Sequence, residues 1–319
     1  MAFVPIRIKL KMKVASYYRY LVDGITNVAF EGMGGGYYWQ DVVGKLLQRE
    51  IGDATLVGHA AGSNSYDVKK YPILRGNFNI NYCQLFDIPI FRPYGFVWSW
   101  ISDYIGNEKL LERWLERVRP NVLFTAQYIR EDIFELCKKY GCKCVFLPWF
   151  NVKPEPYYTG GRTTTALITG AVGQVYPQRS ALAAYMYKMG RDDVVVRCTS
   201  DQSRYPMSKE QYETMVSRTK YYVSGGIFDF QVPPKFYEIC NLGACLVCPK
   251  IPMLEECGFV NGKTCIVIDT PNDLPDIFAS DAWKAISLAG QKMVQERHMM
   301  SNRAEQIREE YNEYKKYIK

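Results

Sequence analysis

Residues 232–248 read VPPKFYEICNLGACLVC, and this stretch decides how the second half of the chain is expected to fold. Proline is tolerated in the first turn of a helix, so Pro233 and Pro234 predict a helix start. Gly243 is placed to end that helix, because glycine readily adopts the conformation that closes many helices. The apolar run after it predicts a buried strand. The helix between has only about two and a half turns at 3.6 residues per turn.

The polar side chains of this helix suit a nucleoside diphosphate. A helix that starts at Pro234 presents unpaired N–H groups and a partial positive charge to phosphate, and Lys235 adds a full charge. Glu238 lies about 5 Å further along and can accept hydrogen bonds from two ribose hydroxyls. The alternative is an ordinary solvated Lys–Glu pair, which contributes a few tenths of a kcal/mol.

Strands and helices alternate on both sides of this stretch. In the second half, the predicted strands are residues 164–169, 193–198, 220–224, 244–248 and 265–269, and the predicted helices are residues 179–189, 209–218, 234–242 and 253–257. In the first half, the predicted strands are residues 13–20, 54–59, 121–125 and 143–147, with a helix before the last of them. Residues 64–104 show no assignable pattern. Such alternation is typical of an α/β fold with parallel sheets covered on both faces.

The length of 319 residues is sufficient for two domains of ordinary size. We expect an N-terminal domain at 1–150, a linker at 151–161, a second domain at 162–290 and a C-terminal helix at 291–319 that could pack back on the first domain. We therefore predict two Rossmann-like parallel-sheet domains that face a cleft. Ligands of open α/β sheets bind at the carboxyl ends of the strands.

A second signal is the loop after the first strand of the second domain, residues 170–179, which read GAVGQVYPQR. Gly170 allows a close approach to the backbone, and the Arg179 guanidinium can fork onto a diphosphate. The loop lacks the Gly-Lys-Ser/Thr ending of a P-loop and is not G-x-G-x-x-G. An unrelated parallel-sheet enzyme such as a dehydrogenase is therefore disfavoured.

From about residue 163 to residue 308, the order of these pieces resembles the spore-maturation-protein-like glycosyltransferases, a family with the GT-B fold. The resemblance rests on the strand and loop that lead to Arg179, and on PPKFYEICNLGACLVC, where the family has an aromatic-glutamate-glycine helix before an apolar strand. It continues through PKIPMLEECGFVNGKTCIVIDTPNDL, which matches the donor loop and the following strand. It ends in AGQKMVQERHMMSNRAEQI, where His298 and Arg303 match a His and an Arg of the closing helix.

The resemblance implies a glycosyltransferase, of hexosyl or pentosyl type, that takes its sugar from a nucleotide diphosphate sugar such as a UDP-sugar. It makes 162–290 the donor domain and 1–150 the acceptor-side domain. Glu238 would hold the ribose, and Arg179 and Lys235 would hold the diphosphate, with Gly170 and Pro234 beside them. The nucleotide sugar is a co-substrate, and no further cofactor is expected.

Two departures bear on the mechanism. Many retaining relatives carry a second acid eight residues before the ribose glutamate, where this chain has Phe230, with Asp229 one place away. Retention and inversion of configuration therefore both stay open. No Asp-x-Asp occurs in the chain, so we expect no catalytic metal, and positive side chains would stabilise the departing diphosphate instead.

The acceptor side offers fewer signals. Gly34, Gly35 and Gly36 precede a predicted helix and would let an acceptor or a donor phosphate approach the backbone. His59 and Asp67 are candidates for the general base that an inverting transfer needs. A structural histidine and a solvated aspartate are the alternative.

The acceptor itself is left open. A modified base in viral DNA is one candidate, which the net charge of +7 permits, and a glycan is another. The alternative function is a non-catalytic nucleotide-sugar-binding protein of the same fold.

The ten cysteines and the hydropathy bear on metal sites, disulfides and localisation. Cys142 with Cys144, and Cys245 with Cys248, are close pairs, but both lie in apolar runs typical of buried strands, so we expect no metal site. A disulfide framework is not expected either. The sequence shows no signal peptide and no membrane span, which predicts the cytoplasm, or the host cytoplasm for a viral protein.

Overall fold

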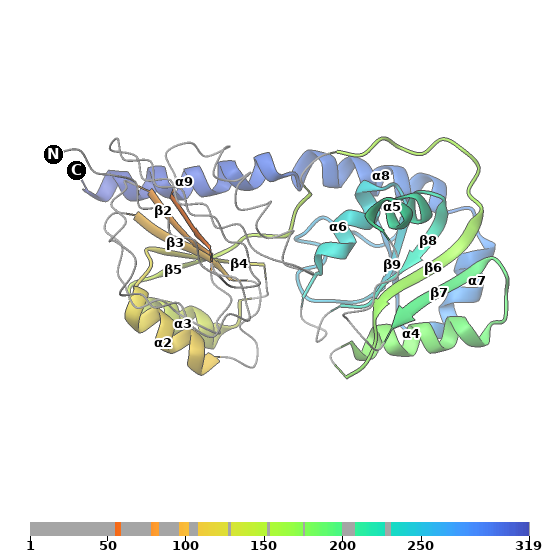
Figure 1. Ribbon diagram of the computed structural model, residues 1–319, viewed down its shortest axis with the longest axis horizontal. Helices are drawn as coiled ribbons and strands as arrows, with labels where there is room; N and C mark the ends of the chain where they lie inside the picture. Colours follow the sequence, from red (N-terminus) through yellow and green to blue (C-terminus); the bar gives the residue numbers. More distant parts are fainter. Residues whose placement is uncertain are drawn as a thin grey trace, which may run out of the picture. The chain divides into compact units, whose positions relative to one another are not determined.

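The computed structural model describes residues 55–58, 78–82, 96–101, 108–126, 129–151, 154–174, 176–199, 208–226 and 231–318 (Figure 1). The chain forms two compact units. The first unit comprises Met1–Leu147 together with Met300–Lys319, and the second unit is Pro148–Met299. The candidate residues His59, Asp67, Asp229 and Gly34 to Gly36, together with Phe230, lie outside the described residues.

The first unit is built on a five-stranded parallel sheet in the order β1-β2-β3-β4-β5. Its strands are β1 (Thr55–Gly58), β2 (Phe78–Tyr82), β3 (Phe96–Ile101), β4 (Val122–Thr125) and β5 (Lys143–Phe146), and its helices are α2 (Glu108–Val118), α3 (Glu131–Lys139) and α9 (Met300–Ile318). Helices α2 and α3 cover one face of this sheet, and α9 lies on the other (Figure 1). The first unit is therefore a three-layered α/β structure that the C-terminal helix completes.

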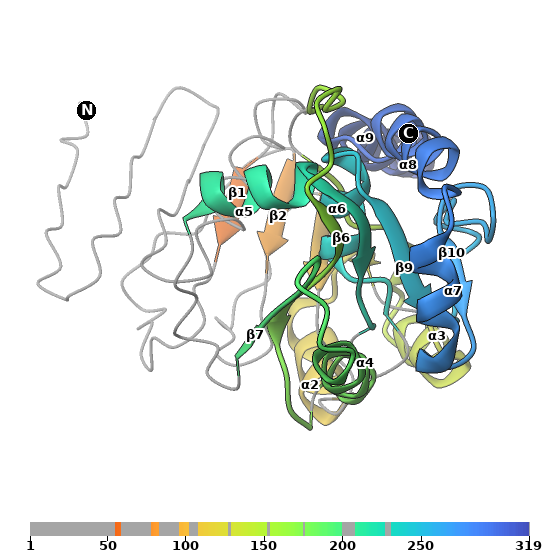
Figure 2. The same cartoon turned by 90° about the vertical axis from the view of Figure 1, so that its right-hand side faces the viewer.

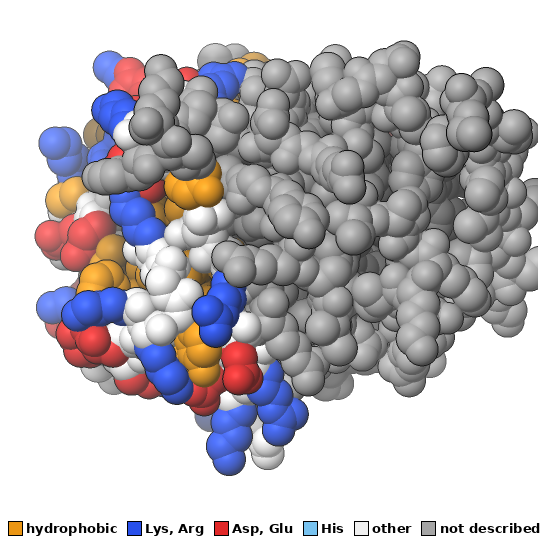
Figure 3. Space-filling view, turned by 90° about the vertical axis from the view of Figure 1, so that its left-hand side faces the viewer, with side chains coloured by type: hydrophobic (Ala, Val, Ile, Leu, Met, Phe, Trp, Pro, Cys, Tyr) orange, Lys and Arg blue, Asp and Glu red, His pale blue; other side chains and the backbone are white. Residues whose placement is uncertain are grey.

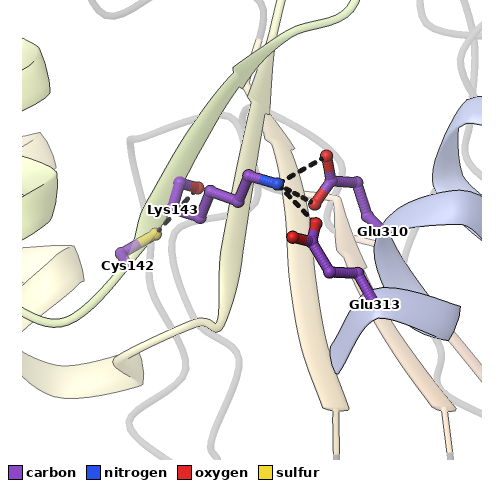
Figure 4. A network of polar contacts seen from close by, with 4 residues as sticks. All are labelled: Cys142, Lys143, Glu310 and Glu313. Atoms are coloured by element: carbon purple, nitrogen blue, oxygen red, sulfur yellow. Dashed lines mark hydrogen bonds and ion pairs between the residues drawn. The ribbon is translucent and has the colours of Figure 1, made fainter. Parts of the chain in front are cut away.

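Ion pairs attach the C-terminal helix to the sheet of the first unit. The ammonium of Lys143, on β5, lies 2.7 Å from a carboxylate oxygen of Glu310 and 2.7 Å from one of Glu313, both on α9 (Figure 4). Ala304 and Ile307 of the same helix are buried. Because the pairs are half-exposed, the buried apolar side chains contribute most of the attachment.

Basic and acidic side chains are interspersed on the described part of the face of the first unit that Figure 3 shows. Arg130 lies 3.1 Å from Glu108 and 2.7 Å from Asp132, and Lys139 lies 2.8 Å from Glu112. These basic side chains are thus paired with carboxylates rather than gathered into a patch of one sign.

The second unit contains another five-stranded parallel sheet, in the order β10-β9-β8-β6-β7. In chain order its elements are β6 (Thr164–Ala171), α4 (Pro177–Lys188), β7 (Val194–Thr199), α5 (Lys209–Ser217), β8 (Thr219–Val223), α6 (Pro234–Asn241), β9 (Cys245–Pro249), β10 (Ile266–Ile268), the 3-10 turn η2 (Pro271–Asp273), α7 (Leu274–Ala279) and α8 (Trp283–Arg297). The chain leaves β6 to one side to form β7 and then crosses back to form β8 on the other side. The carboxyl end of β6 is therefore a topological switch point, where ligands of open α/β sheets bind.

Apolar layers cover both faces of this sheet. Helices α4 and α7 lie against one face, and α5, α6 and α8 lie against the other (Figures 1 and 2). Side chains of β6 alternate between the two layers, as the pleat of a strand requires. Ala166 and Ile168 belong to the buried cluster that includes Leu182 of α4 and Phe278 of α7. Leu167, between them in the strand, is on the opposite face of the sheet.

The predicted α/β class with two parallel-sheet domains is confirmed. Every strand predicted in the second half exists within one or two residues of its expected bounds. The helix of the opening motif is α6, with Pro234 at its first position and Gly243 directly after its cap at a φ of 76°. The bounds of α6 could be predicted from the sequence because a proline marks its start and a glycine follows its end.

Two helix predictions were wrong. Residues 253–257 form turns instead of a helix, and Met253 has a φ of 64°, a left-handed conformation that a helix cannot contain. The helix predicted at 291–319 is interrupted: α8 ends at Arg297, and His298 caps it with φ −133° and ψ 39°. The backbone N–H of Asn151 bonds to the carbonyl of His298 at 2.9 Å, which occupies an oxygen that a continuous helix would use.

Within the part of the chain that the structure describes, no helix combines the length and the apolar character needed to cross a bilayer.

Candidate functional site

The site is built at the carboxyl end of β6, where the chain reverses its order in the sheet. Thr169 and Gly170 are near the end of this strand. The loop after β8 contacts the beginning of α4, because the N–H of Gly226 donates to Oε1 of Gln178 at 3.2 Å. A Cβ on Gly225 would lie 2.9 Å from the backbone nitrogen of Arg179, so only glycine allows this contact.

Arg179 is a buried cation on α4, with 5% of its surface exposed. Its Nη1 donates to the carbonyl of Ala171 at 3.0 Å, and its guanidinium lies 4.4 Å from the ring centre of Tyr176. The Nε of Arg179 is buried and has no hydrogen-bond partner among the described residues. A buried guanidinium N–H without an acceptor is costly, so this donor is poised to bind an oxygen-rich anion.

Lys235 reaches the same strand end from α6. Its Nζ donates to Oγ1 of Thr169 at 3.2 Å and contacts the carbonyl oxygen of that residue at 3.4 Å. It also lies 5.5 Å from the ring centre of Tyr212, on α5. Figure 2 shows α4 and α6 on opposite sides of β6, so the two cations approach the strand end from opposite faces of the sheet.

Gly170 is the point at which the two cations converge. Its φ of 115° is disfavoured for residues with a side chain. A Cβ at this position would lie 3.1 Å from Nζ of Lys235 and 3.2 Å from Nη1 of Arg179. The glycine is therefore required twice, by the backbone conformation and by the positive groups that lie against it.

The surroundings of Lys235 disfavour the charged form of its side chain. Burial and, as a smaller effect, the nearby Arg179 guanidinium lower the pKa of Lys235 to about 8, although Glu238 and Cys198 act in the opposite direction. Two like charges held close together in a low-dielectric site repel each other. An anion bound between them would remove that repulsion.

Glu238 lies one turn along α6 from Lys235 and is partly buried. Its charge raises the pKa of Lys235, which precedes it by three positions on the same helix. Pro234 occupies the first position of the helix, as the sequence predicts. The structure thus brings together Gly170, Arg179, Pro234, Lys235 and Glu238 in one part of the second unit.

His298 and Arg303 have other surroundings. The imidazole of His298 is 3% exposed and lies 4.9 Å from the ring centre of Tyr237. Arg303 belongs to the first unit, where its Nη1 donates to Oε1 of Gln306 at 2.7 Å. Both side chains are buried, and they belong to different units.

Sequence reasoning missed the aromatic and hydroxyl side chains that hold the two cations. Tyr176 stacks on Arg179, Tyr212 lies beneath Lys235, and Thr169 is bonded to Tyr222. The position of Thr169, immediately before the glycine at the strand end, was the available signal for one of them. Tyr212 and Tyr222 carry no such signal, because they come from elements that only the folded sheet brings to the site. Tyr176 lies in the loop at 170–179 that leads to Arg179, so its position was a second available signal.

The cysteine pairs sit in strands, as expected for structural thiols. Cys245 and Cys248 are buried in β9, and burial raises the pKa of both. Cys144 is in β5 and Cys142 immediately precedes it. Among the residues that the structure describes, no three His, Cys, Asp or Glu side chains are grouped so that they could hold a metal ion.

The fold defines the class of protein. The chain has two α/β units, each built on a parallel sheet, and the candidate site lies at the carboxyl ends of the strands of the second sheet. This is the GT-B type of architecture. A family model described as "Glycosyl transferase-like" matches residues 179–309, a segment that begins at Arg179 and contains the whole of α6. No curated protein sequence matches the chain.

Solved structures with this fold include several sugar-transferring enzymes. TarM from S. aureus has a TM-score of 0.55 at 11% identity, over 73% of this chain and 55% of that one. Sucrose-phosphate synthase from Thermosynechococcus elongatus has a TM-score of 0.54 at 12% identity, over 88% of this chain and 94% of that one. A DNA-modifying β-glucosyltransferase has a TM-score of 0.52 at 10% identity, over 86% of this chain and 94% of that one. The chain matches only about half the length of TarM.

The family model covers residues 179–309, which is less than half of the chain. At these identities the structural likeness establishes the fold alone. The narrower resemblance to the spore-maturation-protein-like family stays a prediction.

Proposed function

We propose that this protein transfers a sugar from a nucleotide diphosphate sugar, and that Arg179 and Lys235 bind the diphosphate of the donor. The observation that carries the proposal is the convergence of these two cations over Gly170, at the switch point of the sheet. The unpartnered Nε of Arg179 supplies a further donor that a phosphate oxygen would satisfy.

The same groups account for the chemistry of the leaving group. When the sugar departs, negative charge grows on the nucleoside diphosphate. Cations held rigidly in a partly buried site stabilise that charge more strongly than they would in water. The transfer would therefore need no metal ion, and chelation with EDTA should leave its rate unchanged.

Glu238 is proposed to bind the ribose. A carboxylate accepts hydrogen bonds and can hold two neighbouring hydroxyls at once. Its position one helical turn from Lys235 suits a nucleotide whose phosphates lie at the beginning of α6. UDP is the proposed nucleotide, because a variant of TarM was crystallised with UDP and the neighbouring β-glucosyltransferase was solved with uridine diphosphoglucose.

The acceptor is proposed to contact residues outside the described part of the chain. His59 and Asp67 stay candidates for the catalytic base, Asp229 for the second acid of retaining relatives, and Gly34 to Gly36 for a loop that faces acceptor or phosphate. The neighbouring β-glucosyltransferase is described as DNA-modifying, and a glycan is the other acceptor class. A gel-shift titration with duplex DNA would separate them, since phosphate contacts weaken steeply as salt rises.

The donor site is tested by screening nucleotide sugars by thermal shift, followed by assay of nucleoside diphosphate release. Arg179→Ala should weaken binding of the selected donor by about 10- to 100-fold, because a charged hydrogen-bond donor is lost. The matched control is Arg191→Ala. Arg191 is an arginine that pairs with Asp193 at 2.8 Å immediately before β7, at the opposite end of that strand from the site.

Glu238→Ala should weaken binding of the donor nucleotide while the melting temperature of the free protein stays close to that of wild type. Unchanged donor affinity in both Arg179→Ala and Glu238→Ala would refute the site. Donor binding without release of nucleoside diphosphate, with water, DNA and glycans each offered as acceptor, would instead support the non-catalytic nucleotide-sugar-binding protein.

A further inference from the structure

A pair of buried hydroxyls lies directly behind Lys235. Thr169 and Tyr222 are both 0% exposed, and their hydroxyls share a short hydrogen bond. Thr169 is on β6 and Tyr222 on β8, next to the parallel pair of Leu167 with Tyr222. The threonine hydroxyl is thus bonded on one side to the phenol and on the other to the ammonium of Lys235, 3.2 Å away.

Hydroxyls differ from other acceptors because their hydrogens rotate. A threonine hydroxyl has one hydrogen to donate and two lone pairs to accept. When Lys235 is an ammonium, Oγ1 of Thr169 accepts from it and can direct its own hydrogen to Tyr222. When Lys235 is a neutral amine, Oγ1 can donate to the amine and accept from the phenol. The pair therefore keeps the lysine bonded in both states without movement of heavier atoms.

We propose that the hydroxyls of Thr169 and Tyr222 position Lys235 over Gly170 and hold it both with and without its third proton, so that the donor diphosphate binds with uptake of a proton by this lysine. Thr169 is a positioning residue here, because it acts on the ligand through Lys235. The ligand part of this inference rests on the proposed function, whereas the positioning part does not.

The charges around the lysine support proton uptake on binding. Among the described residues, the groups that shift its pKa are Arg179 on α4, Cys198 on β7 and Glu238 on its own helix, and the ring centre of Tyr212 on α5 lies 5.5 Å away. Burial and Arg179 lower the pKa of Lys235 to about 8 in the empty site, so part of the population is neutral at that pH. A bound diphosphate adds negative charge beside the amine and favours the ammonium.

The first experiment needs no ligand. The titration of Lys235 is followed by NMR in protein labelled with ¹³C-lysine, and the signal is assigned by its absence in Lys235→Met. In Thr169→Val the pKa of Lys235 should fall below the wild-type value, because the ammonium loses an oriented acceptor. Thr169→Ser should restore it. An unchanged titration in Thr169→Val would overturn the positioning role.

The second experiment measures UDP affinity against pH by calorimetry, in buffers of different ionisation enthalpy. Wild type should bind UDP with uptake of a fraction of a proton near pH 8, and the affinity should fall by up to tenfold per pH unit above it. In Thr169→Val the fall should begin at lower pH and the affinity at pH 7 should be several-fold weaker. Binding without proton uptake would overturn the ligand part of the inference.

The matched control is Thr165→Val. Thr165 is on the same strand and the same face as Thr169, about 13 Å away at 3.3 Å per residue, and its hydroxyl bonds to Asp193. Its loss should leave both the lysine titration and the UDP profile unchanged. If wild type binds neither UDP nor any other nucleoside diphosphate, the proposed function fails, and the lysine titration still decides whether Thr169 positions Lys235.

Discussion

Replacement of Lys235 by methionine should stabilise the empty protein, although the lysine is proposed to bind the donor. The side chain is held close to Arg179, and burial and this neighbour lower its pKa from 10.5 to about 8. A difference of about 2.5 pKa units corresponds to roughly 3 kcal/mol against the charged form, at 1.36 kcal/mol per unit. Methionine retains most of the apolar stem and removes the charge.

The net gain should be smaller than this figure, because the variant also loses the bonds to Thr169. We expect a stabilisation of about 1 to 3 kcal/mol at pH 7, since Thr169 keeps its bond to Tyr222. The difference should also depend on pH. The folded-state pKa lies below the unfolded one, so the unfolded chain holds more protons between them, and wild-type stability rises from about pH 8 to about pH 10.5. The advantage of the variant should therefore shrink over that range.

Hydrogen exchange of the amides in β8 and β9 measures this effect, because central strands exchange only when their unit opens. At pH 7 these amides should exchange about 5- to 150-fold more slowly in Lys235→Met than in wild type. The control is Lys188→Met, an exposed lysine in the last turn of α4, which should change little. Faster exchange in Lys235→Met, or a difference that stays constant up to pH 10, would refute the reasoning.

Three further substitutions test other parts of the structure. Gly170→Ala should weaken UDP binding at least tenfold in calorimetry, since the strained φ of 115° alone costs about 1–2 kcal/mol and the new methyl group displaces both cations. Arg162 donates to the carbonyls of Thr219 and Gly243 at 3.2 and 3.0 Å, and its guanidinium lies 5.5 Å from the Trp283 ring centre. Arg162→Ala should therefore lower the free energy of unfolding by about 2–4 kcal/mol in urea denaturation and leave UDP affinity unchanged. Lys143→Met removes the ion pairs with α9 and should speed hydrogen exchange in that helix by only about 2- to 5-fold, as expected for half-exposed pairs.

The second unit could be predicted well because its signals are local. The prolines before Lys235 and the glycine after Leu242 fix the ends of α6, and the short β-branched runs are long enough only for strands. The assignment of Arg179 and Lys235 to one site came from the family resemblance. The structure gives the physical reason, because the start of α6 and the loop after β6 meet at the same edge of the sheet.

Other features depend on contacts between distant segments and left no local pattern. Strands β2 and β3 fall in residues 64–104, where aromatic and turn residues obscured the period, and they are recognised only through their parallel neighbours. The bond of Thr169 to Tyr222 exists because β8 lies beside β6, although β7 comes between them in the chain. The turns at 253–257 arise from a left-handed Met253, a conformation that residue type does not predict.

The most direct test of the central claim is a crystal structure of the protein with UDP. The account predicts that the phosphates lie over Gly170, with oxygens within hydrogen-bond distance of Nε of Arg179 and Nζ of Lys235, and that the ribose hydroxyls meet Glu238. A nucleotide bound elsewhere in the protein, with the Arg179 Nε still without an acceptor, would contradict it.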